Sequence, residues 1–156
     1  MLTLRKATPA DMLLYFEWAN DDTVRQNSIN QEKIVLDDHA RWFEKKILNT
    51  DDTIMLVFLA DGIAIGQLRI EIEHDKEEAI INYSIDKNFR GKGFGTKILA
   101  ETYAYFSSLN IKYPLSGFVK QNNTASIAAF TKAGFFKNEN LFTINNEEYI
   151  KFMKGG

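Results

Sequence analysis

Apolar positions recur first at helical and then at strand spacing along the chain, and this pattern predicts an ordered series of elements. Residues 2–7 are predicted to form a short strand. Residues 8–20 are predicted to form a helix with Thr8 as N-cap and Pro9 at the first helical position. Residues 36–49 predict a second helix, with acids near its start and lysines near its end. The segment between them, 21–34, is polar without strong periodicity and predicts a connection.

The rest of the chain is dominated by strand patterns. Two apolar runs, 53–60 and 63–73, flank Asp61-Gly62 and predict a hairpin, and a further strand follows at 77–86. A helix at 96–109, a strand at 113–120, a helix at 123–134 ended by Gly134, and a hairpin of 135–144 with 147–153 complete the series. This order predicts one α/β domain of the α+β type over residues 1–156, with a mixed sheet and helices on its faces.

Composition narrows the class of protein. With 45% hydrophobic and 13% aromatic residues among 156, the chain is predicted to fold rather than to be disordered. A formal net charge of -2, with both signs interleaved, lacks the basic stripe of a nucleic-acid binder. We expect no membrane span, no secretory signal and, without cysteine, no disulfide or thiolate nucleophile. The two histidines lack partners at metal-ligand spacing, so no metal is predicted, and the cytoplasm is the expected location.

The stretch "NFRGKGFGTKI", residues 88–98, raises the question of a phosphate loop. A mononucleotide P-loop needs G-x-x-x-x-G-K-[ST], and here Lys92 lies between glycines instead. A dinucleotide fingerprint needs G-x-G-x-x-G after the first strand of a βαβ unit, whereas the preceding strands form hairpins. The remaining pattern is R-x-x-G-x-G, formed by Arg90, Gly93 and Gly95. Its alternative interpretation is a glycine-rich turn without a ligand.

A second motif, "NTASIAAFTKAGF", follows one helix and one strand later. Together the two motifs and the element order resemble the GNAT superfamily of acyl-CoA-dependent N-acetyltransferases over essentially the whole chain. The resemblance implies the GNAT fold, with a mixed, mostly antiparallel central sheet splayed around acetyl-CoA and helices on both faces. It also implies direct attack of a neutral amine on the thioester carbonyl, without a covalent enzyme intermediate.

The resemblance implies a set of residues that hold acetyl-CoA. The main chain of Ile85 and Lys87 is expected to bind the pantetheine arm, and Asn123 to reach the same region. Phe130 and Lys132 are expected to flank the cosubstrate. The pyrophosphate is expected to lie against the loop residues Arg90, Gly91, Lys92, Gly93, Phe94, Gly95 and Thr96.

The catalytic groups are less well defined by the motifs. Many GNAT enzymes have tyrosine where this chain has Phe130, and that hydroxyl protonates the departing thiolate. Either Tyr83 substitutes here, or the thiolate, a weak base, leaves unassisted. Glu71 and Glu73 are the carboxylates best placed by order to act as the base, with a solvent-facing alternation as the alternative. Tyr83 fits the core equally well. A non-catalytic acyl-CoA-binding module is a further alternative.

The N-terminal third is where these enzymes differ in acceptor. "WANDDTVR" and "HARWF" resemble a subgroup that acetylates amino sugars linked to nucleotides, in pathways to surface glycans. The same subgroup borders on acetyltransferases of ribosomal-protein N-termini. The expected partner is therefore a small-molecule amine, bound by a monomer or homodimer. Trp42 is predicted to stack on a base or sugar, or to be core. Arg25 is predicted to contact a phosphate, or to pair with Asp21 or Asp22. His39 and Asn20 complete the predicted acceptor set, and Asn20 fits a helix cap better.

Overall fold

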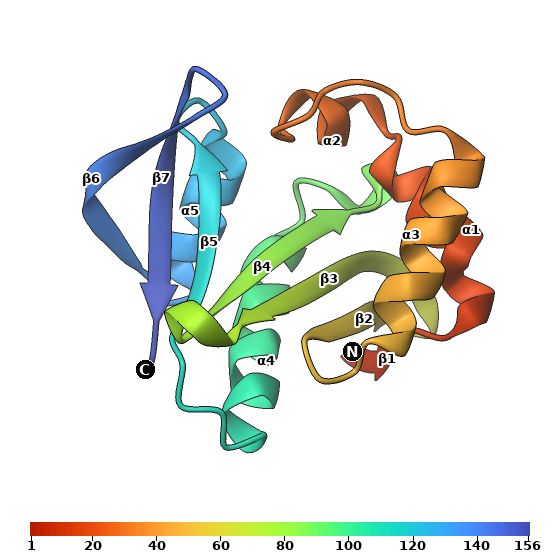
Figure 1. Ribbon diagram of the computed structural model, residues 1–156, viewed down its shortest axis with the longest axis horizontal. Helices are drawn as coiled ribbons and strands as arrows, with labels where there is room; N and C mark the ends of the chain where they lie inside the picture. The colour runs from red at the N-terminus through yellow and green to blue at the C-terminus, as the bar shows by residue number, and fades with distance from the viewer. The chain divides into compact units, whose positions relative to one another are not determined.

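The computed structural model describes residues 1–156 and groups them into two compact units. The N-terminal unit comprises residues 1–71 and 82–90, and the C-terminal unit comprises residues 72–81 and 91–156. Seven strands follow the order β1-β2-β3-β4-β5-β7-β6 (Figure 1). The predicted α+β class and the mostly antiparallel sheet are confirmed. None of the helices combines the length and apolar character needed to cross a bilayer.

The N-terminal unit is built on antiparallel strands. β1 (Leu2–Lys6) pairs with β2 (Thr53–Ala60), which pairs with β3 (Ile63–Glu73) in a register that sets Met55 opposite Arg69. Asp61 and Gly62 both have positive φ, as the predicted two-residue hairpin turn requires. β4 (Glu78–Ile85) contributes its second half to this unit, where the Asp86 N–H donates to the Ile65 carbonyl at 2.7 Å.

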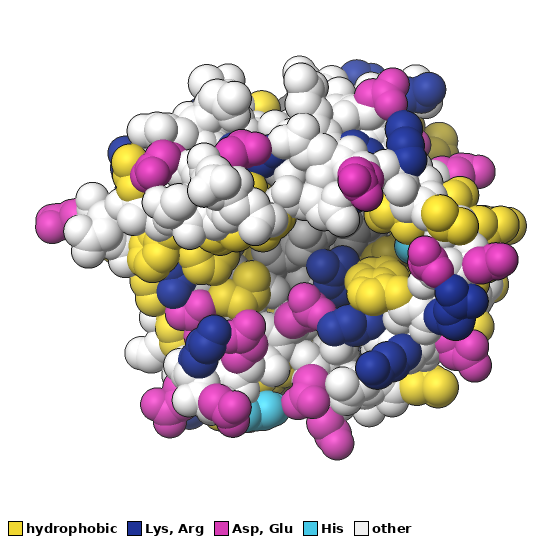
Figure 2. Space-filling view, turned by 45° about the horizontal axis from the view of Figure 1, so that its top comes forward, with side chains coloured by type: hydrophobic (Ala, Val, Ile, Leu, Met, Phe, Trp, Pro, Cys, Tyr) yellow, Lys and Arg dark blue, Asp and Glu magenta, His cyan; other side chains and the backbone are white.

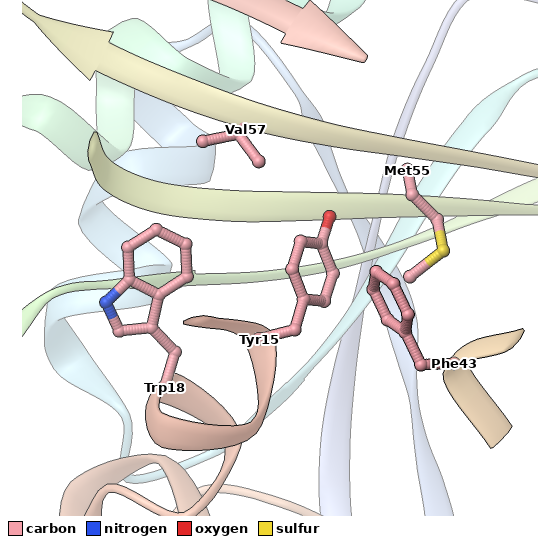
Figure 3. Packing of buried hydrophobic residues seen from close by; sticks show 5 residues of the cluster. All are labelled: Tyr15, Trp18, Phe43, Met55 and Val57. Atoms are coloured by element: carbon pink, nitrogen blue, oxygen red, sulfur yellow. The ribbon is translucent and has the colours of Figure 1, made fainter. Parts of the chain in front are cut away.

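Helices cover one face of these strands. η1 (Pro9–Asp11) leads into α1 (Met12–Ala19), and Thr8 is the N-cap with Pro9 first in the helical turn, as predicted. α3 (Leu36–Leu48) lies against α1 and β2. Figure 3 shows Tyr15 and Trp18 of α1 and Phe43 of α3 directed toward Met55 and Val57 of β2. This cluster is the core of the unit, and the buried Tyr15 hydroxyl donates to the Leu56 carbonyl at 2.7 Å.

A short helix, α2 (Asp22–Gln26), occupies part of the segment predicted to be an irregular connection. The Asp21 carboxylate accepts from the Val24 N–H at 3.2 Å and caps the helix. Five residues are too few to show an apolar period, so this helix depends on its cap rather than on a buried face. The prediction for this segment was therefore wrong.

The C-terminal unit contains α4 (Phe94–Ser108), β5 (Leu115–Lys120), α5 (Thr124–Lys132), β6 (Phe136–Ile144) and β7 (Glu147–Lys154). β7 pairs antiparallel with both β5 and β6, and α4 packs against α5. β4 meets β5 in parallel through Ala79–Leu115 and Ile80–Ser116. Short η2 (His74–Lys76) follows β3, and η3 (Lys87–Phe89) follows β4 in the N-terminal unit.

Candidate active site

The predicted phosphate loop adopts a conformation that suits its glycines. Gly91 and Gly93 have φ of 73° and 81°, and a Cβ built on either meets no atom within 4 Å. Gly93 is the N-cap of α4, a helix of 15 residues, so unsatisfied N–H groups and the positive end of the helix dipole lie at this loop. Open space beside the glycines and the N–H groups of a helix start fit an anion such as a pyrophosphate.

Arg90 precedes the glycines and is engaged within the N-terminal unit. Its Nη2 donates to Asp21 Oδ2 at 2.7 Å, and its Nε donates to the Ile85 carbonyl at 3.1 Å. Burial alone would raise the pKa of Asp21, but the bond from Arg90 and the backbone donors lower it below its usual value. The Ile85 carbonyl predicted to bind pantetheine thus already accepts one hydrogen bond, from the loop arginine.

A second contact ties the same two regions together. The buried Trp18 indole N–H donates to Asp86 Oδ2 at 3.0 Å, and the other oxygen of Asp86 accepts from the Asn88 N–H at 2.9 Å. Lys87 lies exposed in η3. The end of α1 and the start of α2 are therefore fastened to the segment that follows β4.

Residues of the second motif cap a helix and pack in the core, in addition to the predicted contacts with the cosubstrate. Asn123 is the N-cap of α5, and its side-chain oxygen accepts from the Ser126 N–H at 3.3 Å. Phe130 is 2% exposed, with its ring stacked 5.2 Å from Phe152 and edge-on at 5.0 Å to Phe135. Its place in the core of the C-terminal unit leaves it less able to flank a cosubstrate than predicted. Lys132 is exposed at the end of the helix.

Three of the four predicted acceptor residues hold the protein together. The Arg25 Nε donates to the Ala19 carbonyl at 2.7 Å, and its Nη1 donates to the carbonyls of Asn30 at 2.8 Å and Glu32 at 3.2 Å. Its Nη2 donates to Ser28 Oγ at 3.1 Å. These bonds order the loop after α2, and neither predicted aspartate pairing is formed. The phosphate contact of Arg25 stays a prediction.

His39 belongs to the core of the N-terminal unit. It is 3% exposed, its Nε2 donates to the Met12 carbonyl at 3.1 Å, and its ring lies 5.2 Å from Phe16 and 5.5 Å from Trp42. Burial lowers its pKa below the ordinary value, so it is neutral at pH 7. These contacts favour a packing role for His39, and its acceptor role stays a prediction.

Asn20 fastens the approach to α3. Its side-chain oxygen accepts from the Ile34 N–H at 2.7 Å, and its amide nitrogen donates to the Ile34 carbonyl at 2.8 Å. Asn20 is also the C-cap of α1, as the alternative interpretation held. Both bonds are to backbone, which favours the structural interpretation, and the acceptor contact of Asn20 stays a prediction.

Trp42, like Arg25 and Asn20, is partly exposed, and it also packs against the core of the N-terminal unit, as the core interpretation holds. Its ring lies beside polar side chains of β3, and Cζ of Arg69 is 4.9 Å from the ring centroid. Lys46, one helical turn later on α3, donates to Glu71 Oε1, and the other oxygen of Glu71 lies 3.6 Å from Arg69 Nε. Figure 2 shows lysine and arginine side chains beside hydrophobic ones on this part of the surface, with acidic side chains among them.

The two predicted catalytic residues lie on opposite faces of the strands. The Gln67 amide donates to Ser84 Oγ at 3.1 Å, so Gln67 and Ser84 share a face, and Glu71 lies four residues from Gln67 on that face. Tyr83, next to Ser84, is directed to the other face. Glu71 and Tyr83 therefore do not converge on one point.

The environment of Glu71 bears on its role as a base. Burial would raise its pKa, but the bond from Lys46 and the charge of Arg69 lower it below the usual value. The carboxyl is ionised at neutral pH and a weaker base than a free glutamate. Its assignment as the base stays a prediction. Glu73 is more exposed and pairs with Lys76 at 3.2 Å, in agreement with the solvent-facing alternative.

Sequence reasoning did not single out Gln67 and Arg69. The available signal was the alternation of "GQLRIEIE", in which polar residues occupy every second position. One interpretation of that alternation is a solvent-facing row from Arg69 onward, whereas Arg69 and Glu71 contact Trp42 and Lys46 of α3, Gln67 is 7% exposed and the Arg69 side chain is 19% exposed.

Comparison with known proteins agrees with this arrangement. The spermidine N-acetyltransferase from Vibrio cholerae, solved with CoA and spermine, aligns with a TM-score of 0.85 and 20% identity over 99% of this chain and 95% of that chain. The aminoglycoside acetyltransferase AAC(6')-Ib, solved with ribostamycin and coenzyme A, gives 0.83 and 19% over 99% and 93%. The ribosomal-protein-alanine N-acetyltransferase from Brucella melitensis gives 0.80 and 21% over 99% of both chains.

At these identities the structural similarity establishes the fold alone. None of the curated proteins matches the sequence significantly. The family model described as an acetyltransferase (GNAT) domain matches residues 1–136, which is most of the chain. With the glycine loop at the start of α4 and the shared fold, this match shows that the chain belongs to the GNAT family of acetyltransferases.

Proposed function

We propose that this enzyme transfers acetyl from acetyl-CoA to the primary amine of an amino sugar, with a nucleotide-linked sugar as the preferred form. Acetyl-CoA supplies an activated thioester, which the neutral amine attacks directly. The glycine loop Gly91–Thr96 and the first turn of α4 would hold its pyrophosphate. The main chain at Ile85 and Lys87 and the side chain of Asn123 stay the proposed contacts to the pantetheine arm.

The observation that carries the acceptor proposal is the charge and shape of the surface around Trp42. Two cations, Lys46 and Arg69, surround a single carboxylate, Glu71, and leave one positive charge in excess. A half-exposed indole stands beside them. Sugar rings and bases pack against indole faces, and anionic groups are attracted by the surplus charge.

The same balance of charge argues against a polyamine acceptor at this surface. A polyamine carries several positive charges and needs carboxylates that are not already neutralised. Here the one carboxylate of the cluster already has two cationic partners, so a polycation would have to displace one of them. Spermine and ribostamycin are bound in two of the similar structures and differ from each other, so the acceptor must be measured for this chain.

An acceptor screen tests the proposal. Release of free CoA thiol is followed with acetyl-CoA and each of five classes: free amino sugars, nucleotide-linked amino sugars, aminoglycosides, spermidine, and short peptides. We expect the highest kcat/KM for a nucleotide-linked amino sugar. Preference for spermidine or for peptides over every sugar would overturn the acceptor proposal and leave the acetyltransferase activity standing. Binding of acetyl-CoA without thiol release in any class would favour the non-catalytic alternative.

A further inference from the structure

Two polar atoms on β3 are buried without a hydrogen-bond partner, and they lie two residues apart on the same face. They are Oε1 of Gln67 and Nε of Arg69. Gln67 is more than nine-tenths buried. Buried polar atoms are almost always paired with protein, water or ligand, because an unpaired one costs about 1–3 kcal/mol. Two such atoms on one face of β3, each with under 1 Å² of accessible surface, make this face a candidate for recognition of a polar ligand.

The surrounding contacts fix the orientation of both groups. The Gln67 amide nitrogen donates to Ser84 Oγ at 3.1 Å, which leaves its carbonyl oxygen as the acceptor without a donor. The Arg69 guanidinium is held 4.9 Å from the centre of the Trp42 ring. Glu71 Oε2 lies 3.6 Å from Arg69 Nε, at the outer limit of a hydrogen bond, so a closer acceptor would bind this donor better. Gln67 Oε1 therefore lacks a hydrogen-bond donor, and Arg69 Nε lacks a close hydrogen-bond acceptor.

Few chemical groups meet that demand. An ammonium group only donates, so it would satisfy Gln67 but be repelled by Arg69. A phosphate or carboxylate oxygen only accepts, so it would satisfy Arg69 but oppose the Gln67 oxygen. A hydroxyl group accepts from Arg69 and donates to Gln67 at once. Sugars present hydroxyls on a ring whose apolar face packs on indole, and Trp42 stands beside this pair.

The pair is also placed where an acceptor is needed. Gln67 is bonded to Ser84, and the next residue on β4 is Ile85, whose main chain is the proposed contact to the pantetheine arm. A sugar bound at Gln67 would thus lie beside the strand that is proposed to hold the acetyl donor.

We propose that Gln67 and Arg69 form a hydroxyl-recognition site that selects the sugar of the acceptor, with Trp42 as its packing wall. This inference rests on the proposed amino-sugar activity and adds to it the residues that distinguish one sugar from another. In this site Arg69 donates a hydrogen bond to the hydroxyl oxygen, and the Gln67 carbonyl accepts one from the hydroxyl hydrogen. The charge of Glu71 keeps the guanidinium in place.

The test compares an accepted amino sugar with its series of monodeoxy analogues. The wild-type enzyme should lose about tenfold or more in kcat/KM for one analogue, because removal of that hydroxyl leaves both buried groups unpaired again. Gln67→Met keeps the length of the side chain and removes the carbonyl. Arg69→Lys keeps the charge and removes the Nε donor. In both variants, kcat/KM for that analogue should be less than threefold below kcat/KM for the parent sugar. The KM for acetyl-CoA should be unchanged.

Matched controls separate this role from a structural one. Arg41→Lys makes the same change at an exposed arginine of α3, and Gln121→Met makes it at an exposed glutamine in the turn after β5. Both should keep the wild-type discrimination. Calorimetric binding of the same sugars to the CoA-bound enzyme gives the comparison without turnover, and thermal scans report whether each variant is folded.

The outcomes distinguish the two levels of the proposal. If amino sugars are acetylated but Gln67→Met and Arg69→Lys discriminate as wild type does for every hydroxyl, the pair binds only a structural water and the recognition site is refuted. If the variants lost kcat/KM equally for the amino sugar and for acetyl-CoA, the recognition site would also be refuted, because Gln67 and Arg69 would then be structural. If no amino sugar is acetylated while another amine is, the proposed function itself is refuted together with the site.

Discussion

Replacement of Gly117 on β5 by alanine should destabilise the C-terminal unit through one contact. A Cβ at this position would lie 2.4 Å from Cζ and 2.9 Å from Cε1 of Phe130. Carbon atoms in contact are normally about 3.5–4.0 Å apart, so the ring would have to retreat by more than about 1 Å. Phe130 has little room to do so, because it is 2% exposed and lies between Phe135 and Phe152.

Overpacking of this kind costs about 1–3 kcal/mol. For a chain of this length, each 1 kcal/mol lowers Tm by about 2–4 °C, so Gly117→Ala should melt roughly 2–12 °C below wild type. Urea unfolding should show a lower midpoint at an unchanged slope, because the surface exposed on unfolding is the same.

The matched control is the same substitution in a Phe130→Leu background. Leucine lacks the ring atoms that the new Cβ would meet, so Gly117→Ala should cost less than about 0.5 kcal/mol there, and the two substitutions should be strongly non-additive. A Gly117→Ala protein that is as stable as wild type, or that is equally destabilised in both backgrounds, would refute the assignment of this contact. It would also leave Phe130 room to flank the cosubstrate, as the sequence predicts.

Three further predictions concern the site and its supports. Gly93→Asp should weaken acetyl-CoA binding about tenfold or more in calorimetry, whereas Gly93→Ala, which carries the same strain at a φ of 81° without the charge, should weaken it less. Glu71→Gln should raise the acceptor KM with kcat within about tenfold of wild type, because a carboxylate with a lowered pKa is a weak base, and a loss of kcat of about a hundredfold or more would instead identify Glu71 as the base. Burial lowers the pKa of His39 below its ordinary value, so the unfolded chain binds that proton more tightly and stability should fall as pH drops below about 6.5. His39→Gln should lose this part of the pH dependence of Tm, and an unchanged dependence would contradict the neutral, buried state.

The strands and long helices could be predicted because each carries a pattern that repeats over several residues. The β2–β3 hairpin follows from Asp61-Gly62 between apolar runs, and α3 from its apolar face and terminal charges. α2 could not be predicted in this way. It is held by one capping carboxylate, that of Asp21, in a segment without a period.

The acceptor residues were harder to predict for a related reason. An arginine in a polar segment has the same sequence appearance whether it binds a ligand or its own backbone, and Arg25 binds backbone carbonyls up to seven residues away. His39 follows two acids and looks exposed, yet the turn of α3 carries it into the core. Gln67 and Arg69 show the reverse case. Their burial depends on how the neighbouring elements cover β3, which strand alternation does not encode.

The two bonds that join the end of α1 to the segment after β4 affect how this enzyme can be recombined with its relatives. An exchange of residues 1–71 alone, made to transfer acceptor preference, would separate Trp18 from Asp86 and Asp21 from Arg90. Each separation would leave a buried or half-buried polar group without its partner. The segment that can be transferred therefore consists of two pieces of sequence, residues 1–71 and 82–90. A chimera has to carry both pieces, although residues 72–81 lie between them in the chain.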